Sequence, residues 1–171
     1  MADEVRPSRM SREAFVVRFG GVFEHSPWIA EAAWDAGLTP EQDTAAGLLA
    51  AMLKTLRRAP RERKLALIQA HPELVGRLAV QGDLTAASSA EQASAGLDRC
   101  TREEYERFQA LNEAYRAKFD FPFIMAVRGR TRAEILAAFE DRLANDPVRE
   151  FETALEQIER IARLRLQALL P

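Results

Sequence analysis

His71 is the residue whose type and position most directly suggest chemistry. The chain has only two histidines, and this one ends a helical pattern over residues 61–70 and stands directly before Pro72. A following proline disfavours helical geometry at His71, so we expect its imidazole at a helix break, where side chains tend to face clefts. With an unperturbed pKa of about 6.5, histidine is the natural acid or base at neutral pH. From position alone, an imidazole that caps a helix or fills the core is the alternative.

Glu91 is the second candidate, within the run Ser88-Ser89-Ala90-Glu91-Gln92. A carboxylate here could hold the imidazole or share its proton transfer. The same residues also have a structural interpretation, because Ser88 and Glu91 stand at the spacing of a capping box, in which the glutamate reaches back to the start of its helix. The sequence leaves both roles open.

Arg165 is the third candidate, because it lies between Leu164 and Leu166 in an amphipathic helical pattern. A guanidinium kept among apolar side chains suits a carboxylate or carbonyl ligand, since its planar fork pairs two oxygens at once. The alternative is an intramolecular salt bridge.

Other kinds of site have little support. One cysteine, two histidines and the absence of an HExxH motif predict no metal site. No glycine-rich phosphate loop or dinucleotide fingerprint is present. Ser88 and Ser89 stand in a polar connector rather than on a strand–elbow–helix turn, which argues against a serine hydrolase. A lone cysteine such as Cys100 is usually a small buried hydrophobe.

Composition is that of an ordinary globular protein. The 171 residues are 47% hydrophobic and 29% charged, and the net charge is −2. Interspersed acids and bases argue against nucleic-acid binding, which normally needs a basic face. No apolar run approaches the roughly 18 residues of a membrane span, and the N-terminus lacks a signal-peptide core, so no membrane association is expected. The single cysteine makes the reducing cytoplasm the expected compartment.

Hydrophobic periodicity predicts one all-α domain of about eight helices over residues 11–171, after a flexible N-terminal arm at residues 1–10. One stretch differs, because residues 121–129 are extended and apolar and are bounded by Pro122 and Gly129. No second convincing strand exists to pair with this segment. Its backbone polar groups therefore need other partners, either side chains and water or a bound polar ligand.

Six segments stand out in chain order: Phe23-Glu24-His25-Ser26-Pro27-Trp28-Ile29-Ala30, His71-Pro72-Glu73-Leu74, Ser88-x-x-Glu91-Gln92-x-x-Ala95-Gly96-Leu97, Leu111-Asn112-x-x-Tyr115-x-x-Lys118-Phe119, Phe121-Pro122-Phe123-Ile124-x-Ala126-Val127-Arg128-Gly129 and Ile161-x-x-Leu164-Arg165-Leu166. Together they resemble the 2-oxo-4-hydroxy-4-carboxy-5-ureidoimidazoline (OHCU) decarboxylase family. The resemblance runs from about Phe15 to Leu170, and its motifs are specific in combination although each is weak alone. One departure is visible, since the family usually has glycine where this chain has Asp120. Aspartate tolerates turn geometry well, so we expect altered loop detail rather than lost activity.

The resemblance implies an all-α bundle, usually a homodimer, that uses no metal or organic cofactor. It implies His71 as the catalytic acid/base, with Glu91 and Arg165 as the other catalytic side chains. It also implies a set of substrate contacts, the extended segment contributing through its backbone: Pro72, Ser88, Ser89, Ala90, Glu91, Gln92, Phe123, Ile124, Met125, Ala126, Val127 and Arg165. We expect the imidazole, the carboxylate and the guanidinium to converge on one small cavity.

The implied activity is the cofactor-free decarboxylation of OHCU to (S)-allantoin in urate (purine) catabolism. The substrate carries a carboxylate and a hydroxyl on one ring carbon, next to a C=N bond that can accept the electrons left by CO2. The enzyme then has to orient the carboxylate, stabilise charge and move protons. Two alternatives remain open at this point: a decarboxylase of a related ureide or imidazoline, and a non-enzymatic helical domain that binds a ureide.

Overall fold

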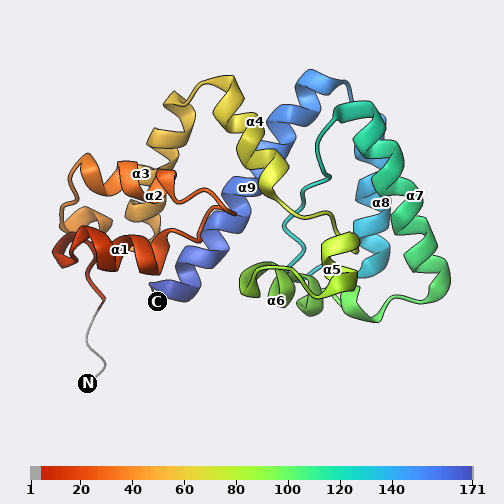
Figure 1. Cartoon of the computed structure of the whole chain (residues 1–171), viewed down its shortest axis with the longest axis horizontal. Helices are drawn as coiled ribbons and strands as arrows, with labels where there is room; N and C mark the ends of the chain where they lie inside the picture. The colour runs from red at the N-terminus through yellow and green to blue at the C-terminus, as the bar shows by residue number, and fades with distance from the viewer. Residues whose placement is uncertain (1–4, 171) are drawn as a thin grey trace. The chain divides into compact units, whose positions relative to one another are not determined.

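The computed structural model describes residues 5–170, apart from the side chains of Arg77 and Leu78. The fold is all-α, as expected (Figure 1). The described residues form nine α-helices and three short 3-10 helices and no strand, where about eight helices were expected. In chain order these are η1 (Pro7–Arg9), α1 (Arg12–Phe19), α2 (Trp28–Asp35), η2 (Pro40–Asp43), α3 (Ala45–Arg58), α4 (Arg61–Ala70), α5 (Arg77–Gln81), α6 (Ala86–Ser94), η3 (Leu97–Arg99), α7 (Arg102–Phe119), α8 (Arg132–Leu143) and α9 (Pro147–Leu169).

The described chain falls into two compact units. Unit 1 comprises the residues up to Ala70 together with those from Glu159 onward, and unit 2 runs from His71 to Ile158. Helix α9 contributes its first half to unit 2 and its second half to unit 1. No described helix is long and apolar enough to cross a membrane.

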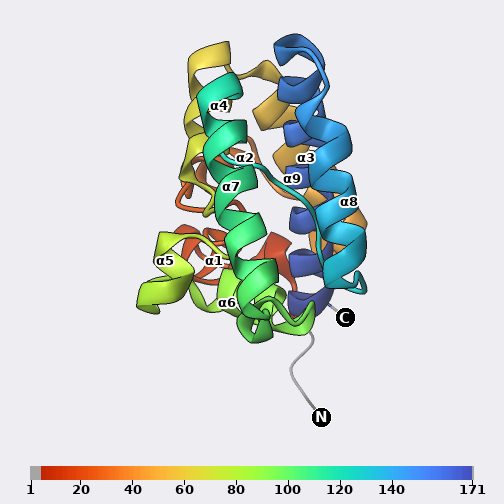
Figure 2. The same cartoon turned by 90° about the vertical axis from the view of Figure 1, so that its right-hand side faces the viewer.

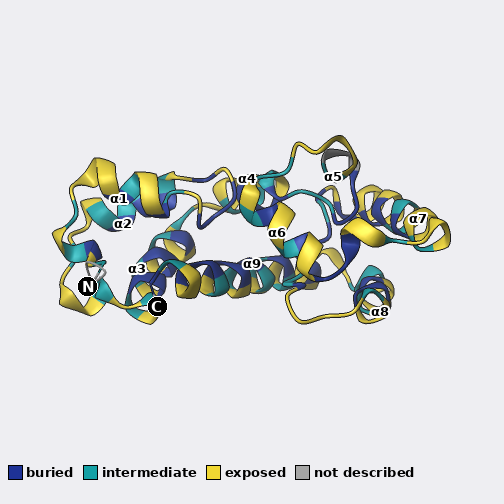
Figure 3. Ribbon diagram, turned by 90° about the horizontal axis from the view of Figure 1, so that it is seen from below, coloured by how far each residue is buried: buried dark blue, intermediate teal, exposed yellow. Residues whose placement is uncertain are grey.

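Unit 1 is built on the apolar face of α3. Leu48, Met52 and Leu56 recur at helical spacing and are each at most 2% exposed. Figure 3 shows this alternation of buried and exposed positions along the helices. Helix α2 packs against α3 and buries Ile29, while α1 packs against α2 and buries Phe15. Burying side chains of this size is worth about 1.5–3 kcal/mol each, which makes the shared apolar face the main stabilising element of the unit.

The N-terminal arm expected at residues 1–10 is described from Val5 onward, and its first four residues lie outside the described part of the chain. Pro7 is buried in η1. The backbone N–H and the hydroxyl of Ser8 donate to the Asp43 carboxylate over 2.7 and 2.8 Å. Helix η1 is therefore attached to η2, which the polar composition of the arm did not predict.

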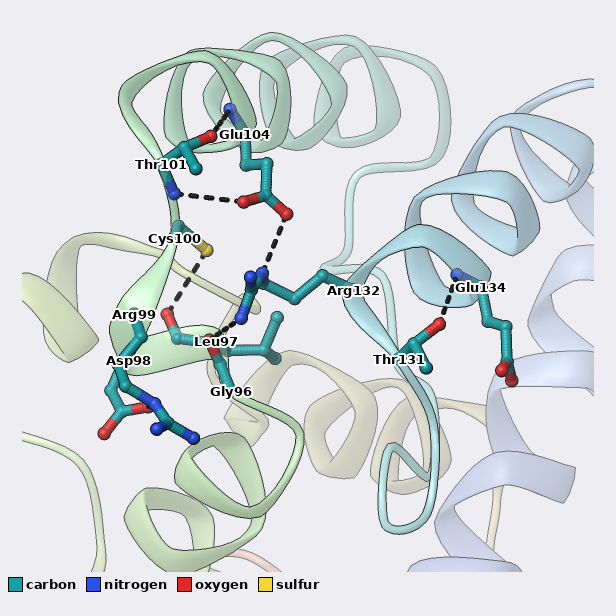
Figure 4. Close-up of polar contacts among 10 residues, drawn as sticks. All are labelled: Gly96, Leu97, Asp98, Arg99, Cys100, Thr101, Glu104, Thr131, Arg132 and Glu134. Carbon is teal, nitrogen blue, oxygen red and sulfur yellow. Dashed lines mark hydrogen bonds and ion pairs between the residues drawn. The ribbon is translucent and has the colours of Figure 1, made fainter.

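In unit 2, the chain leaves the end of α7 and, before α8 begins, returns along the length of that helix. This helix of 18 residues spans about 27 Å at 1.5 Å per residue. Arg132, in the first turn of α8, donates to the Glu104 carboxylate over 2.8 Å and to the Gly96 carbonyl over 3.2 Å, so α8 begins beside the start of α7 (Figure 4). Only an extended chain, at about 3.3 Å per residue, covers that length in so few residues.

The extended irregular segment expected at residues 121–129 is thereby confirmed. Residues 121–127 have no regular secondary structure, and Arg128 and Gly129 form a turn. Helices α7 and α8 lie side by side with this segment passing between their opposite ends (Figure 2). The segment begins after Asp120, whose φ of +61° lies in the left-handed region. That backbone conformation favours glycine and is tolerated by aspartate, which explains why both residue types suit this position.

Candidate active site

His71 is the first residue after α4 and lies at a bend, so the predicted helix break is confirmed. Its exposed fraction is 6%, and Pro72 beside it is half-buried. Burial of this degree is compatible with either of the roles considered for the imidazole. The surroundings of the next four residues decide how firmly it is positioned.

The segment that follows His71 is held by side-chain amides from α6 and α7. The Gln92 side chain uses both of its polar atoms on this segment: Oε1 accepts from the Val75 N–H over 3.1 Å, and Nε2 donates to the Glu73 carbonyl over 3.3 Å. Asn112 donates to the Leu74 carbonyl over 2.9 Å, and Gln109 donates to the Val75 carbonyl over 2.6 Å. A stretch without regular structure thus has its backbone groups paired by three amide side chains, as buried peptide groups require.

Val75 carries the strain of this segment. Its φ is +52°, which for a β-branched residue is a true outlier, and it is 5% exposed. A conformation of this kind costs about 1–3 kcal/mol and persists only where the surroundings hold it in place. The Val75 N–H donates to Gln92 and the Val75 carbonyl accepts from Gln109, and these two hydrogen bonds hold the strained backbone in place. The exposed Arg116 side chain adds an ion pair to Glu73 over 2.7 Å.

Helix α6 begins earlier than the Ser88–Glu91 spacing suggested. Thr85 is its N-cap and accepts from the Ser88 N–H over 3.2 Å, so the helix runs Ala86–Ser94. Ser88 therefore stands inside the first turn, and the interpretation of Ser88 and Glu91 as a capping box is wrong. The physical reason is competition between hydroxyl residues close together in the sequence, Thr85 and the Ser88-Ser89 pair, which spacing alone does not resolve.

The residues predicted to contact substrate on α6 divide between two faces. Ser88 and Gln92 are buried, at 4% and 6% exposure, while Glu91 is half-buried. Ser89 and Ala90 are exposed. Because Thr85 caps α6, the capping-box role considered for Glu91 does not apply. The burial pattern places it at the edge of the face that Gln92 turns toward the His71–Val75 segment.

The extended segment is held at two of its backbone groups. The Ile124 carbonyl accepts from Arg142 Nη1 over 2.5 Å, and the Ala126 N–H donates to Gln157 Oε1 over 3.0 Å. The Arg142 guanidinium also lies 4.2 Å from the centroid of the Phe123 ring. Among the hydrogen bonds of the described residues, none is donated by the backbone amides of Phe123 or Met125. Such amides are available donors for a polar ligand.

A buried polar cluster fixes Arg142 in turn. Glu150 is fully buried and accepts from the Tyr115 hydroxyl over 2.7 Å, from Arg142 Nε over 2.7 Å and from the Asn145 amide over 3.0 Å. Burial, followed by the hydrogen bond to Glu150, raises the pKa of Tyr115 well above its usual value. A buried carboxylate with a guanidinium and two further donors satisfies the condition under which such groups are tolerated. The cluster anchors the extended segment through the Ile124 carbonyl.

Sequence reasoning missed these supporting residues. These residues lie on helices whose sequence pattern is dominated by apolar periodicity, so their individual roles do not stand out. They are Gln109, Asn112, Arg142, Glu150 and Gln157. One signal could have found Asn112 and Glu150, which are polar residues at buried positions of an apolar face, at 3% and 0% exposure. Buried polar side chains are paired, so a polar residue at such a position predicts a partner.

Arg165 makes the salt bridge that was considered as its alternative role. Its Nη1 donates to Glu24 Oε2 over 2.9 Å and to the Gly21 and Val22 carbonyls over 3.2 and 3.4 Å. Both charged side chains are buried, Arg165 at 9% and Glu24 at 2% exposure. This pair belongs to unit 1, whereas His71, Pro72, residues 88–92 and residues 123–127 belong to unit 2. The expected convergence of the three catalytic candidates stays a prediction.

Metal ligands do not cluster in the part of the chain that the structure describes, where no group of three or more His, Cys, Asp or Glu side chains could hold an ion. Hydrogen-bonding side chains flank two of the candidate segments: amide side chains hold residues 73–75, and the Arg142 guanidinium holds Ile124. This arrangement suits the recognition of a ligand that carries carbonyl and carboxylate oxygens.

Comparison with known proteins gives a consistent result. Residues 8–167 match the family described as OHCU decarboxylase. The chain is 44% identical to the 2-oxo-4-hydroxy-4-carboxy-5-ureidoimidazoline decarboxylase of Haloferax volcanii, over 93% of this chain and 90% of that protein. It is 36% identical to the protein of the same name from Mus musculus, over 98% of this chain and 93% of that one.

Solved structures agree with the sequence comparison. A crystal structure of (S)-allantoin synthase superposes with a TM-score of 0.75 at 32% identity, over 96% of this chain. The match spans about half of that crystallised chain, 52% of its length. A crystal structure of OHCU decarboxylase in the presence of (S)-allantoin gives a TM-score of 0.69 at 22% identity, which shows the shared fold.

Proposed function

Because this chain belongs to the OHCU decarboxylase family, we propose that it decarboxylates 2-oxo-4-hydroxy-4-carboxy-5-ureidoimidazoline to (S)-allantoin in urate catabolism, without a cofactor. The observation that carries the proposal is the 44% identity to a decarboxylase of that name across 90% of its length. The geometry adds that His71 precedes a strained segment held by three amide side chains. A firmly positioned imidazole is what proton transfer in a fixed direction requires.

The reaction needs no external electron sink. When the carbon–carbon bond to the carboxylate breaks, its electron pair forms a C=C bond to the neighbouring ring carbon. The electrons of the C=N bond move onto nitrogen, which takes up a proton, and CO2 leaves. Loss of the hydroxyl proton and delivery of a proton to the neighbouring carbon then give the carbonyl and the stereocentre of allantoin.

His71 is the acid/base of this sequence in our proposal. It takes the hydroxyl proton and returns one to the neighbouring carbon, and delivery to a single face accounts for the S configuration. Glu91 holds the imidazole or the ureido N–H groups and shares the proton transfer. General acid/base assistance of this type is worth about 10²–10⁴-fold in rate. Glu91 is half-buried on α6, and a carboxylate there suits an acid/base partner of the imidazole.

Arg165 and the extended segment bind the substrate in this proposal. The Glu24 carboxylate and two backbone carbonyls fix the orientation of the Arg165 guanidinium. The planar fork of N–H donors that a guanidinium presents matches the two oxygens of the substrate carboxylate. The backbone of Phe123, Ile124, Met125, Ala126 and Val127 holds the ureido and ring carbonyl groups. Pro72 and the α6 residues Ser88 to Gln92 complete the contacts.

We also propose that the protein works as a homodimer in the cytoplasm. The dimer rests on the family resemblance, and the compartment rests on a single cysteine in 171 residues. Sedimentation equilibrium of the full chain tests the first, and a molar mass of one chain across the concentration range would contradict it.

The test of the activity is to generate the unstable substrate in situ by oxidising urate and to follow allantoin by circular dichroism. With the protein present, we expect rapid growth of the (S)-allantoin signal; without it, slow decay to a racemate gives little signal. The folded Arg165→Lys variant should act mainly through a raised KM, because lysine keeps the charge and loses the fork. A folded wild-type protein that leaves the decay unchanged would refute the proposed activity.

A further inference from the structure

A pocket of about 310 Å3 lies in unit 2, on the side of α6 that carries Ser89 and Ala93. Its volume is at the lower end of the range of roughly 300–1,000 Å3 that small-molecule sites occupy. Its walls come from four successive elements, α5, α6, η3 and the start of α7. The apolar side chains that line it are Val75, Ala79, Val80, Leu84, Ala93, Leu97 and Tyr105.

The rim of this pocket exposes apolar surface that the fold does not use. Val80 is 63% exposed and Tyr105 is 39% exposed, and they are two of the four large hydrophobic side chains that the described residues expose. Both line the same pocket. Exposed apolar groups that gather at a concave site, rather than scatter singly, indicate a binding surface.

The polar groups of the pocket define the ligand that it can take. Asp98 is the one charged side chain among the described residues that line it, and it is exposed. Ser89, Gln92 and Cys100 supply uncharged polar atoms, and the Cys100 thiol lies 3.4 Å from the Leu97 carbonyl (Figure 4). An anion such as a carboxylate would meet apolar walls and an aspartate. The pocket therefore suits an uncharged, mostly apolar molecule with a ring that lies against Tyr105.

The floor of the pocket is connected to the segment that positions His71. Val75 and Gln92 both line it, and they are the two partners of the 3.1 Å hydrogen bond that holds the left-handed Val75 backbone. A molecule in the pocket lies against both residues that make that bond. Because Val75 is a strained residue with few alternatives, small changes in its support shift the segment rather than being absorbed locally.

We propose that this pocket binds uncharged and mostly apolar small molecules, and that its occupancy changes the position of the His71–Val75 segment. The pocket shares Ser89 and Gln92 with the proposed substrate contacts, and its other lining residues lie outside them. The binding part stands without the proposed decarboxylase activity. The effect on turnover would rest on that activity, so the experiment uses readouts that do not depend on it.

Indole is a suitable probe, because it is neutral, flat and small enough for the pocket. Isotope-labelled full-length protein is titrated with indole and followed by NMR of the valine methyl groups and histidine rings. For nine heavy atoms we expect a dissociation constant of about 1 mM. The Val75 and Val80 methyl signals should shift saturably, and the His71 ring signals should shift with them. His25, in unit 1 and 65% exposed at its side chain, should not move.

Matched variants separate the pocket from general effects. Ala93→Phe places a ring in the pocket and should abolish the shifts, whereas Ala137→Phe, on an exposed position of α8, should leave them unchanged. If Ala93→Phe fails to fold, labelling of the single cysteine with benzyl methanethiosulfonate replaces it, and indole should slow the reaction at Cys100. Indole-3-acetate should bind more weakly than indole.

The outcomes that overturn the proposal are specific. Absence of saturable shifts at Val75 and Val80, together with unprotected Cys100, would show that the pocket is not a binding site. Saturable shifts at those valines with an unmoved His71 would refute the connection to the segment. Equal binding of indole-3-acetate and indole would refute the assigned ligand class.

Discussion

Replacing Gln92 by methionine tests whether this residue acts by positioning the chain beside His71 or by touching the substrate. The two side chains have similar length and volume, so the change removes the amide and leaves the packing. Both amide atoms of Gln92 are used on the backbone of residues 73 and 75. We therefore expect Gln92→Met to lower stability as well as turnover.

The magnitude follows from the two lost hydrogen bonds. Each contributes about 1 kcal/mol net, and leaving the buried Val75 N–H without a partner costs roughly 1–2 kcal/mol more. The sum predicts a loss of about 3–4 kcal/mol in the free energy of unfolding. For a chain of this size that corresponds to a fall in Tm of roughly 10 °C. Release of the strained Val75 backbone should lower kcat by at least about tenfold with a smaller change in KM.

Urea unfolding followed by circular dichroism measures the first effect, and steady-state kinetics of allantoin formation measure the second. Gln167→Met is the matched control, because Gln167 is exposed on α9 and its replacement should change stability by less than about 0.5 kcal/mol. A Gln92→Met protein of normal stability and normal kcat, but with a raised KM, would refute the positioning argument and leave Gln92 with its substrate contact alone.

Three further predictions follow from the site and its support. His71→Asn should lower turnover at least about a hundredfold and leave helicity and Tm unchanged. The same allantoin assay and thermal melting measure these effects. Near-normal turnover would remove His71 from the mechanism. Glu91→Gln should lower turnover without lowering Tm, because Thr85 and not the Ser88–Glu91 pair caps α6; a lowered Tm with normal kinetics would restore the structural role. Tyr115 is the subject of the third prediction: its folded pKa is raised, so the stability that its burial contributes is complete below its unfolded pKa of about 10 and is lost as pH rises beyond it. In a Tyr105→Phe variant, tyrosinate absorbance should therefore appear together with the loss of helical circular dichroism, and tyrosinate formation in a protein that is still fully helical would contradict the burial argument.

Local patterns in the sequence were enough to predict the helical class and the one extended segment between the helices. Spacing of apolar residues predicted the all-α class, and Pro72 after His71 predicted the break where α4 ends. The bounded apolar run at residues 121–129 was correctly set apart from the helices. These features depend on periodicity and on backbone restrictions of single residues, which act over a few positions and are visible in one dimension.

Where several nearby residues could cap the same helix, or one residue could take two roles, only the folded structure shows which alternative is used. Thr85, Ser88 and Ser89 can each cap a helix, and the structure selects Thr85 because Ser88 is buried in the first turn of α6. The sequence allowed Arg165 either a ligand contact or an intramolecular salt bridge. The structure shows a salt bridge to the buried Glu24, which is 141 residues away in the chain. No local pattern reports a partner at that separation, because pairing of buried charges depends on which helices meet.

The sequence by itself therefore determined the class of fold, the helix break at His71, the unpaired extended segment and, through its motifs, the family. Only the tertiary structure decided what supports them: the amide side chains of Gln92, Gln109 and Asn112 around the His71–Val75 segment, and the Glu150 cluster behind the extended one. The reason is physical. Backbone groups outside helices must form hydrogen bonds somewhere in the fold. The side chains that bond them come from helices far along the chain, and the apolar pattern of those helices does not reveal these hydrogen bonds.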